Sequence, residues 1–315
     1  MKASEENQSS NLRKAVTLSL IAVREDDLIE AFLTGRSERT IVAYSADLKD
    51  FQTFLGVTTP REAARSLIAY GQGAANAMVI KYKANLFERK LSSATVNRRL
   101  AALRSLIRLA RTLGIVPWEL EVRNVKSKAY RETRGPGLSG VRALISVAKT
   151  RRARDLAIIR LLYDLALRRG EVAALDIEDL DLEEGTLSVI AKGKTEPDLL
   201  TLPEPTKIVL KSWLSGRGDE SGPLFSNFDR AGKGERLTGR SIHRIVVALG
   251  LVAGVKIRPH GLRHAAITRC LDKMNGNYRV AQRFSRHADP RTVMVYDDNR
   301  KDLGGEAAKM IADEV

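Results

Sequence analysis

Side chains suited to breaking a phosphodiester are gathered in the second half of the chain. They belong to the runs Leu-Arg-Arg-Gly-Glu, Ala-Lys-Gly-Lys and His-Gly-Leu-Arg-His, which are followed by one more histidine and a tyrosine. The candidate catalytic residues are Arg168, Lys192, His260, Arg263, His287 and Tyr296. Cations can bind the non-bridging phosphate oxygens, a tyrosine can attack phosphorus, and an acid can protonate the departing oxygen. We therefore expect phosphodiester cleavage that needs no metal and no other cofactor.

The two arginines are the expected phosphate ligands. A guanidinium stays charged and offers a fork of donors that matches two oxygens, and Arg168 and Arg263 are the pair we choose. Taken singly, each has an ordinary structural explanation, such as capping the C-terminus of a helix. Tyr296 is a weak nucleophile because its ordinary pKa is about 10, so it needs cations or a base such as His260 or His287. The prediction depends on the whole set.

The order and spacing of these motifs resemble the tyrosine recombinases, the family of phage integrases and Xer-like site-specific recombinases. The family's patterns are an arginine in a Gly-Leu-Arg-x-x-Glu box, a lysine in a β-turn, His-x-Leu-Arg-His, a Gly-His pair and a nucleophilic tyrosine. The resemblance covers about residues 25–300, and the C-terminal motifs are its most specific part.

This resemblance implies a role for each matched position. Tyr296 would attack the scissile phosphate and form a 3′-phosphotyrosyl link. Arg168 and Arg263 would hold the non-bridging oxygens. His260 and His287 would assist through proton handling and phosphate contacts. The covalent link would store the energy of the phosphodiester bond, so that religation would need no ATP.

The other matched positions surround this set. Lys192 would protonate the leaving 5′-oxygen, although Lys194 stands two residues on and is the alternative. Glu171 matches the acidic position after the first arginine and is expected to orient it. Asp176 sits where an acidic residue is common and would lie behind the reacting groups. His264 is expected to be a packing or hydrogen-bonding partner rather than an acid.

Two positions depart from the family's pattern. Ala166 and Arg286 stand where the family usually has glycine, and neither change removes a reacting group. Arg286 is either an added phosphate contact or a solvated side chain. Tyr278 lacks the spacing from a motif histidine, so we reject it as the nucleophile.

The charge of the chain points to a polyanionic partner. The formal net charge is +15, and nucleic acid is the first candidate for a protein this basic. Residues 1–80 hold 9 Lys/Arg and 10 Asp/Glu, whereas residues 81–134 hold 14 and 4. The positive charge is therefore concentrated in one segment.

That segment contains an arginine stripe on a predicted helix. Arg104, Arg108 and Arg111 are spaced so that they share one face, and Arg98 and Arg99 precede them. A lone stripe of this kind is usually a solvated face. With the local charge bias and the chemistry above, we predict instead that these arginines contact DNA.

The predicted fold is mainly α with a small β-sheet in the C-terminal domain, an α+β protein built as a two-domain DNA clamp. We expect the following parts: 1–23, a flexible arm; 24–120, a helical core-DNA-binding domain; 121–137, a linker; 138–300, the catalytic domain; 301–315, a tail. Leu303, Ala307, Met310 and Ile311 would give this tail an apolar helix face. That face could dock on a neighbouring subunit or pack on its own.

Apolar spacing predicts the main elements. One helix would follow Ser37, its N-cap, with its apolar side at Ile41, Tyr44, Leu48, Phe51 and Leu55. A second would begin near Ser93, its N-cap candidate, and end at Gly114, with its apolar side at Val96, Leu100, Leu103, Ile107 and Ala110. Thr186–Ala191 and Leu199–Leu202 read as strands around a Gly-Lys turn.

The composition indicates the cellular compartment in which the protein works. Cys270 is the only cysteine, so no intrachain disulfide can form. No apolar run approaches the roughly 20 residues of a membrane span. The N-terminus shows no signal-peptide pattern. We expect a cytoplasmic protein with no membrane partner.

The sequence therefore predicts a site-specific recombinase acting on double-stranded DNA at specific sites. Family resemblance implies four protomers on two DNA partners, with strand exchange through a Holliday junction. Two rivals are a type IB topoisomerase-like enzyme and a DNA-binding relative that has lost catalysis. The second is disfavoured because all six candidate reacting positions hold competent residues.

Overall fold

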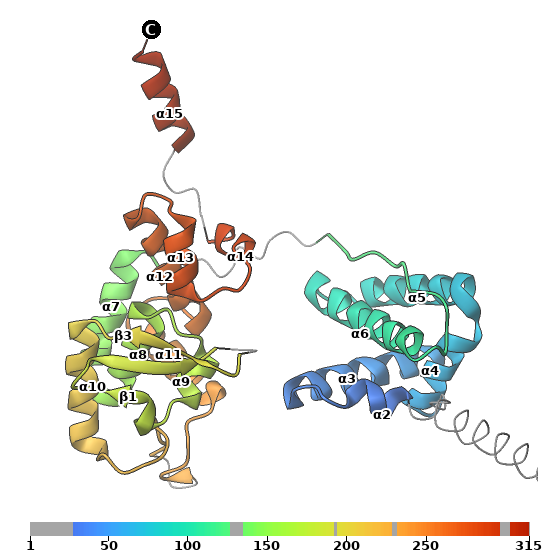
Figure 1. The fold of residues 1–315 in the computed structure, drawn as a ribbon, viewed down its shortest axis with the longest axis horizontal. Coiled ribbons are helices and arrows are strands. Elements are labelled where there is room, and N and C mark those ends of the chain that lie inside the picture. The colour runs from blue at the N-terminus through green and yellow to red at the C-terminus, as the bar shows by residue number, and fades with distance from the viewer. Residues whose placement is uncertain (1–27, 127–134, 192–193, 229–231, 297–302, 315) are drawn as a thin grey trace, which may run out of the picture. The chain divides into compact units, whose positions relative to one another are not determined.

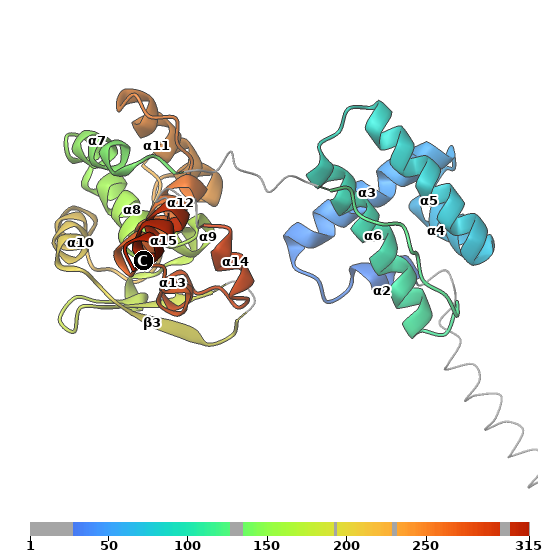
Figure 2. The same cartoon turned by 90° about the horizontal axis from the view of Figure 1, so that it is seen from above.

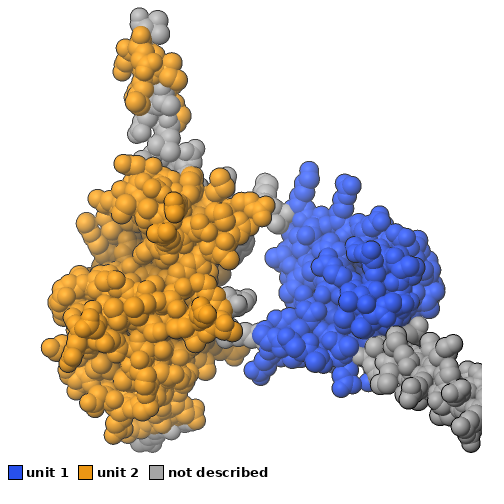
Figure 3. Space-filling view, in the orientation of Figure 1, with its two compact units in different colours: residues 1–128 blue, residues 129–315 orange. Residues whose placement is uncertain are grey.

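The computed structural model describes residues 28–126, 135–191, 194–228, 232–296 and 303–314. The chain divides into two compact units, residues 1–128 and 129–315, which Figure 3 colours separately. The fold is mainly helical with one small antiparallel sheet, which confirms the predicted fold class. The predicted arm, residues 1–23, lies outside the described residues.

Unit 1 is built from helices, shown in blue to green in Figure 1. They are α2 (Leu28–Leu33), α3 (Glu38–Leu55), α4 (Pro60–Ala69), α5 (Gly71–Glu88) and α6 (Ser93–Thr112). Thr59 caps α4 by accepting a hydrogen bond from the Glu62 N–H, and Pro60 provides the first turn. One apolar core, including the fully buried Phe51 and Tyr82, joins α2 to α6.

Helix α6 follows the predicted apolar pattern. Val96, Leu100, Leu103, Ile107 and Ala110 are all buried, so this stripe faces the core as expected. The helix cap is Ser92, whose hydroxyl accepts from the Thr95 N–H at 3.3 Å, and the predicted cap Ser93 is instead the first helical residue. Gly114 ends the helix with a left-handed φ of 73°.

Unit 2 contains the remaining elements. They are α7 (Leu138–Lys149), α8 (Ala153–Asp164), α9 (Arg169–Ala174), the 3₁₀ turn η3 (Ile177–Asp179), β1 (Leu180–Asp181), β2 (Thr186–Ile190), β3 (Pro197–Thr201), α10 (Glu204–Arg217), α11 (Gly239–Val252), α12 (Pro259–Lys273), α13 (Tyr278–Ser285), α14 (Arg291–Met294) and α15 (Leu303–Ala312). The main core gathers side chains from α7 to α12, and Figure 2 views the same elements from above.

The sheet has the order β1-β2-β3, with both pairs antiparallel. Leu187 pairs with Leu200 and Val189 with Asp198, so the predicted hairpin is present. Leu187 and Val189 are buried in the main core, which fixes the register of the middle strand. Strand β1 adds a third strand that the sequence pattern did not indicate.

Helix α12 packs against α8 and α13 and is the element on which the candidate site is built. The segment before α7 comes very close to the start of α12. A Cβ added at Gly135 would lie 2.3 Å from the Gly261 carbonyl oxygen, so only glycine fits there. Gly135 belongs to the predicted linker, and the end of that segment is therefore packed against α12.

Candidate active site

Helix α12 presents most of the candidate residues along one side. His260, Arg263 and His264 are spaced three and four residues apart, and Thr268 follows one turn later. Arg263 and His264 are buried, whereas the His260 ring reaches solvent. The histidines and the arginine of the motif His-Gly-Leu-Arg-His thus share one side of a helix.

Arg263 ties two distant segments together. Its side chain is 1% exposed, and its guanidinium donates to the carbonyl oxygens of Ala166 and Ser285. It also lies 3.3 Å from Nε2 of His287. A buried guanidinium is stable only when its donors are satisfied, and backbone carbonyls satisfy them here. Arg263 therefore fixes the α8–α9 turn against the segment that carries His287.

Arg168 precedes α9 and is held by Glu171. The Glu171 carboxylate accepts from the Arg168 side chain at 2.7 Å and from its backbone N–H at 2.8 Å. Burial raises the pKa of Glu171, but the hydrogen bonds from Arg168 and the charges of Arg286 and Arg168 lower it overall. The Arg168 side chain is 31% exposed, so it can still meet a ligand. Glu171 is placed to orient Arg168, as the resemblance implies.

His287 sits in a hydrogen-bond network that assigns its tautomer. The Ser285 hydroxyl donates to the Gln282 carbonyl and lies 2.8 Å from Nδ1 of His287. Nε2 faces the Arg263 guanidinium, which can only donate. Nδ1 therefore carries the hydrogen and Nε2 is the acceptor. His287 is a neutral imidazole whose Nε2 lone pair faces Arg263 at the site.

The pKa values of the site follow from burial and from crowded positive charge. Burial, and then the charge of Arg168, lowers the pKa of Arg263 to about 10, which leaves it charged at neutral pH. Burial, and then the charges of Arg263 and Arg168, lowers the pKa of His287 to about 4 and also lowers that of His260. Arg168 therefore acts on all three groups from within the same site, and both histidines are neutral at pH 7.

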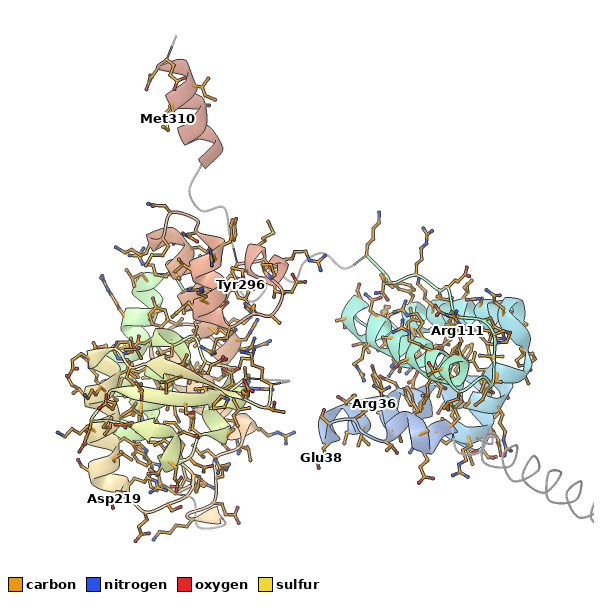
Figure 4. All side chains as sticks on the ribbon, in the orientation of Figure 1. Arg36, Glu38, Arg111, Asp219, Tyr296 and Met310 are labelled. Carbon is orange, nitrogen blue, oxygen red and sulfur yellow. The ribbon has the colours of Figure 1, made fainter. Side chains whose placement is uncertain are left out.

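Tyr296 lies just beyond α14, with its ring 5% exposed among the site histidines (Figure 4). Ring centroids are 4.9 Å away for His264, 5.4 Å for His287 and 6.5 Å for His260. The Thr268 hydroxyl donates to the Tyr296 carbonyl at 2.8 Å and lies 3.3 Å from Nδ1 of His264. These contacts fix the backbone of Tyr296 against α12.

The structure thus gathers Arg168, His260, Arg263, His287 and Tyr296 at one place. His264 joins them as the packing and hydrogen-bonding partner that the sequence predicts. Lys192 lies outside the described residues.

Lys194 is the alternative lysine and is described. It forms an ion pair with Asp198 at 2.7 Å. It also lines a basic cavity of about 420 Å³ together with His287 and the α13 side chains Arg279 and Arg283. The turn after β2 therefore reaches the edge of the site.

Two residues predicted beside the reacting groups, Asp176 and Arg286, have protein partners of their own. Asp176 follows the other end of α9 from Arg168 and pairs with Arg236. Arg286 is not a solvated side chain, because only 5% of it is exposed and its guanidinium pairs with Glu171 at 2.9 Å. The Arg286 guanidinium is thus engaged by protein groups, and Arg286 also lines the cavity next to His287.

The arginines of α6 are engaged within unit 1. Arg98 pairs with Asp47 and Arg99 with Asp50, each at 2.7 Å. Arg104 donates to the Val122 carbonyl at 2.8 Å and to the Asn124 side chain at 2.6 Å, and Arg111 pairs with Glu119. Arg108 is exposed. These arginines are therefore largely paired within unit 1, although Arg98, Arg108 and Arg111 remain exposed.

Sequence reasoning missed the residues that hold the reacting groups. Thr268 and Ser285 are buried hydroxyls that fix Tyr296 and His287, respectively. Thr268 lies four residues after His264 on the same helix, so helical spacing was the available signal. No comparable signal pointed to Ser285, because its carbonyl meets Arg263 only in the folded chain.

The depressed pKa of His287 predicts a loss of stability on mild acidification. Between pH 6.5 and 4 the unfolded chain binds a proton at this residue and the folded chain does not, so the stability falls as the pH drops through that window. We expect the free energy of unfolding, measured in urea at pH 7 and pH 5, to fall less in His287→Asn than in the wild-type protein. Equal losses in the two proteins would contradict the assigned environment.

The described residues contain no group of three or more His, Cys, Asp or Glu side chains that could hold a metal ion. None of their helices is long and apolar enough to cross a membrane.

Known proteins share both the sequence and the fold. Residues 139–302 match the phage integrase family, and residues 31–113 match the SAM-like N-terminal domain of phage integrases. The protein named tyrosine recombinase slr0733, from Synechocystis sp., is 35% identical over 304 residues, which cover 94% of this chain and 97% of that protein. A tyrosine recombinase of Synechococcus elongatus is 34% identical over 93% of this chain and 95% of its own.

A solved structure of the Tn1549 transposon integrase in complex with transposon right end DNA has the same fold. The TM-score is 0.72 at 14% identity, and the match covers 91% of this chain and 99% of that one. The chain therefore belongs to the phage integrase family and is a tyrosine recombinase, a member of an enzyme class that carries out site-specific DNA recombination.

Proposed function

We propose that this recombinase cuts and rejoins double-stranded DNA through a 3′-phosphotyrosyl intermediate formed by Tyr296. The observation that carries the proposal is the packing of this tyrosine ring among His260, His264 and His287, in the site that also holds Arg168 and Arg263. The alternative of a topoisomerase-like enzyme shares this chemistry. The family match does not favour it.

The charges of the site suit the transition state of phosphoryl transfer. Negative charge grows on the non-bridging oxygens as the tyrosine oxygen attacks, and two preorganised guanidinium groups can stabilise it. Arg168 and Arg263 already lie close enough for one to lower the pKa of the other. A bound phosphate would relieve that repulsion.

The histidines can accept the proton that the tyrosine hydroxyl loses. His287 is neutral, and its Nε2 is an acceptor that faces Arg263. A neutral imidazole beside the phenol can take the proton as the tyrosine oxygen bonds to phosphorus. His260 is the second neutral imidazole of the site, and its exposed ring is available to the phosphate.

The leaving 5′-oxygen needs an acid, which we assign to Lys192. The support is the position of this residue in the sequence, two residues before Lys194, which lines the same cavity as His287. Lys194 is the alternative, although it is already paired with Asp198. Protonating the leaving oxygen would complete the cleavage step, and the same residue would deprotonate the attacking hydroxyl on religation.

The net charge of +15 supports a duplex DNA partner with specific recombination sites. The Tn1549 integrase is described in complex with DNA, and we extend that partner to this chain. Of the α6 arginines, Arg108 is the best placed to contact a phosphate, since the others are engaged in unit 1. We also propose that the reaction takes place in the cytoplasm.

Strand exchange between two sites would require several subunits on DNA, and we propose four, acting in pairs through a Holliday junction. Helix α15 exposes Met310, labelled in Figure 4, and Ile311. An exposed apolar pair on a terminal helix can dock on a neighbouring subunit. This supports trans docking of the tail, residues 301–315.

A nicked suicide substrate tests the proposed function. Loss of a short fragment after cleavage prevents religation, so the wild-type protein should accumulate a covalent adduct that survives denaturation. Sequencing the adducts formed on genomic DNA would give the target site. Two copies of that site should then recombine, whereas relaxation of supercoiled DNA without exchange between sites would favour the topoisomerase alternative. Tight binding without any adduct would refute the enzyme proposal.

A further inference from the structure

Arg286 has a backbone conformation that is unusual for its residue type. It ends α13 with φ 56° and ψ 40°, in the left-handed region where glycine is preferred. Such a conformation is strained for a residue that carries a side chain. Its side chain is nevertheless 5% exposed, so it makes contacts that offset this strain.

The contacts of Arg286 all lie within the active-site region. One guanidinium nitrogen donates to the Leu165 carbonyl at 3.1 Å and to the Phe284 carbonyl at 3.3 Å. The other donates to Oε2 of Glu171 at 2.9 Å. Leu165 lies in the turn between α8 and α9. The Arg286 side chain therefore links the segment that carries His287 to the segment that carries Arg168.

Arg263 links the same two segments close by. Arg263 joins Ala166 to Ser285, and Arg286 joins Leu165 and Glu171 to its own segment. Two buried guanidinium groups thus link the same two segments. One of them is a candidate phosphate ligand, and the other pairs with a carboxylate.

Glu171 is shared between two arginines. Oε1 accepts from the Arg168 side chain, whereas Oε2 accepts from the Arg168 backbone and from Arg286. Without Arg286, Oε2 would have a free lone pair and could form a bidentate pair with the Arg168 guanidinium, as arginine and carboxylate groups tend to do. That pairing would draw Arg168 onto the protein and away from a phosphate.

We infer that Arg286 is a positioning residue. It holds Glu171 in place, so that Arg168 can bind the scissile phosphate at the same time as Arg263 and His287. The inference rests on the proposed function. It differs from a direct role in DNA binding, since both terminal nitrogens of the guanidinium are engaged, one by two carbonyls and the other by Glu171.

The test compares cleavage and binding in full-length Arg286→Gly. Glycine suits the left-handed backbone, so the substitution removes only the side chain and its contacts. With the suicide substrate, we expect the rate of adduct formation at saturating DNA to fall about 10- to 100-fold. The DNA dissociation constant should stay within about twofold, with the same salt dependence. Arg286→Lys should recover part of the rate, because it keeps a cation beside Glu171.

A double-mutant cycle shows whether Arg286 acts through Glu171. Once Glu171→Gln is present, Arg286→Gly should have a much smaller further effect on the rate, since coupled residues do not add. Arg154→Ala is the matched control. Arg154 is another buried arginine of unit 2, bound to Asp155 and the Ser226 carbonyl, and its loss should lower the thermal stability but not the cleavage rate.

The outcomes separate the inference from the proposed function. If the wild-type protein forms no adduct, the proposed function fails. If the wild-type protein forms adducts and Arg286→Gly cleaves at the same rate, the inference alone fails. It also fails if Arg286→Gly weakens binding and flattens the salt dependence while sparing the rate, which is the behaviour of a direct phosphate contact. If Arg286→Gly does not fold, the same measurements can be made on Arg286→Asn, because asparagine tolerates the left-handed backbone.

Discussion

Replacing Tyr296 by phenylalanine should abolish the covalent protein–DNA adduct while leaving DNA affinity and the fold unchanged. The substitution keeps the ring that packs among the site histidines and removes only the hydroxyl. The hydrogen bond from Thr268 goes to the backbone carbonyl and is also kept. No other group in the site can form the same link to phosphorus, so the loss should exceed the detection range of a gel assay for adducts.

Tyr278→Phe is the matched control for this prediction. Tyr278 lies on α13 and packs against the same small apolar cluster as Tyr296. Its substitution should leave adduct formation intact. Adducts that persist in Tyr296→Phe, or that disappear in Tyr278→Phe, would move the nucleophile to another residue. DNA binding by both variants, measured by fluorescence anisotropy, shows that any loss is chemical.

Much of the fold is readable from the sequence because its signals are local. The α6 stripe from Val96 to Ala110 is buried as its spacing predicts, and Gly114 ends the helix with the left-handed φ that favours glycine. The hairpin follows from alternation around Leu187 and Val189. The cap of α6 was missed by one residue, since Ser92 and Ser93 are equally good candidates by type.

The parts of the site that the sequence does not reveal are those made by distant pairs. Arg98 and Arg99 read as free cations because Asp47 and Asp50, which neutralise them, lie about 50 residues away on another helix. Arg286 read as either a phosphate contact or a solvated side chain because Glu171 is 115 residues earlier. Charge spacing along a helix cannot show which carboxylate the tertiary fold brings to it.

The two arginines proposed to bind the phosphate, Arg168 and Arg263, should differ in their effects on stability. Arg168→Ala and Arg263→Ala each remove a donor to developing charge, so each should lower the cleavage rate about 100- to 1000-fold. Arg263→Ala should also destabilise the protein, because the Ala166 and Ser285 carbonyls lose their buried donor. Each buried group left unsatisfied costs about 1–3 kcal/mol.

Arg168→Ala should have little effect on the stability, since its side chain is partly exposed and Glu171 keeps Arg286 and a backbone N–H as partners. Single-turnover cleavage and urea unfolding of both variants measure the two effects. A stable Arg263→Ala protein that cleaves slowly would mean that the two carbonyls find water instead. An Arg168→Ala protein that cleaves at the wild-type rate would remove Arg168 from the reaction and leave Arg263 as the sole guanidinium on the phosphate.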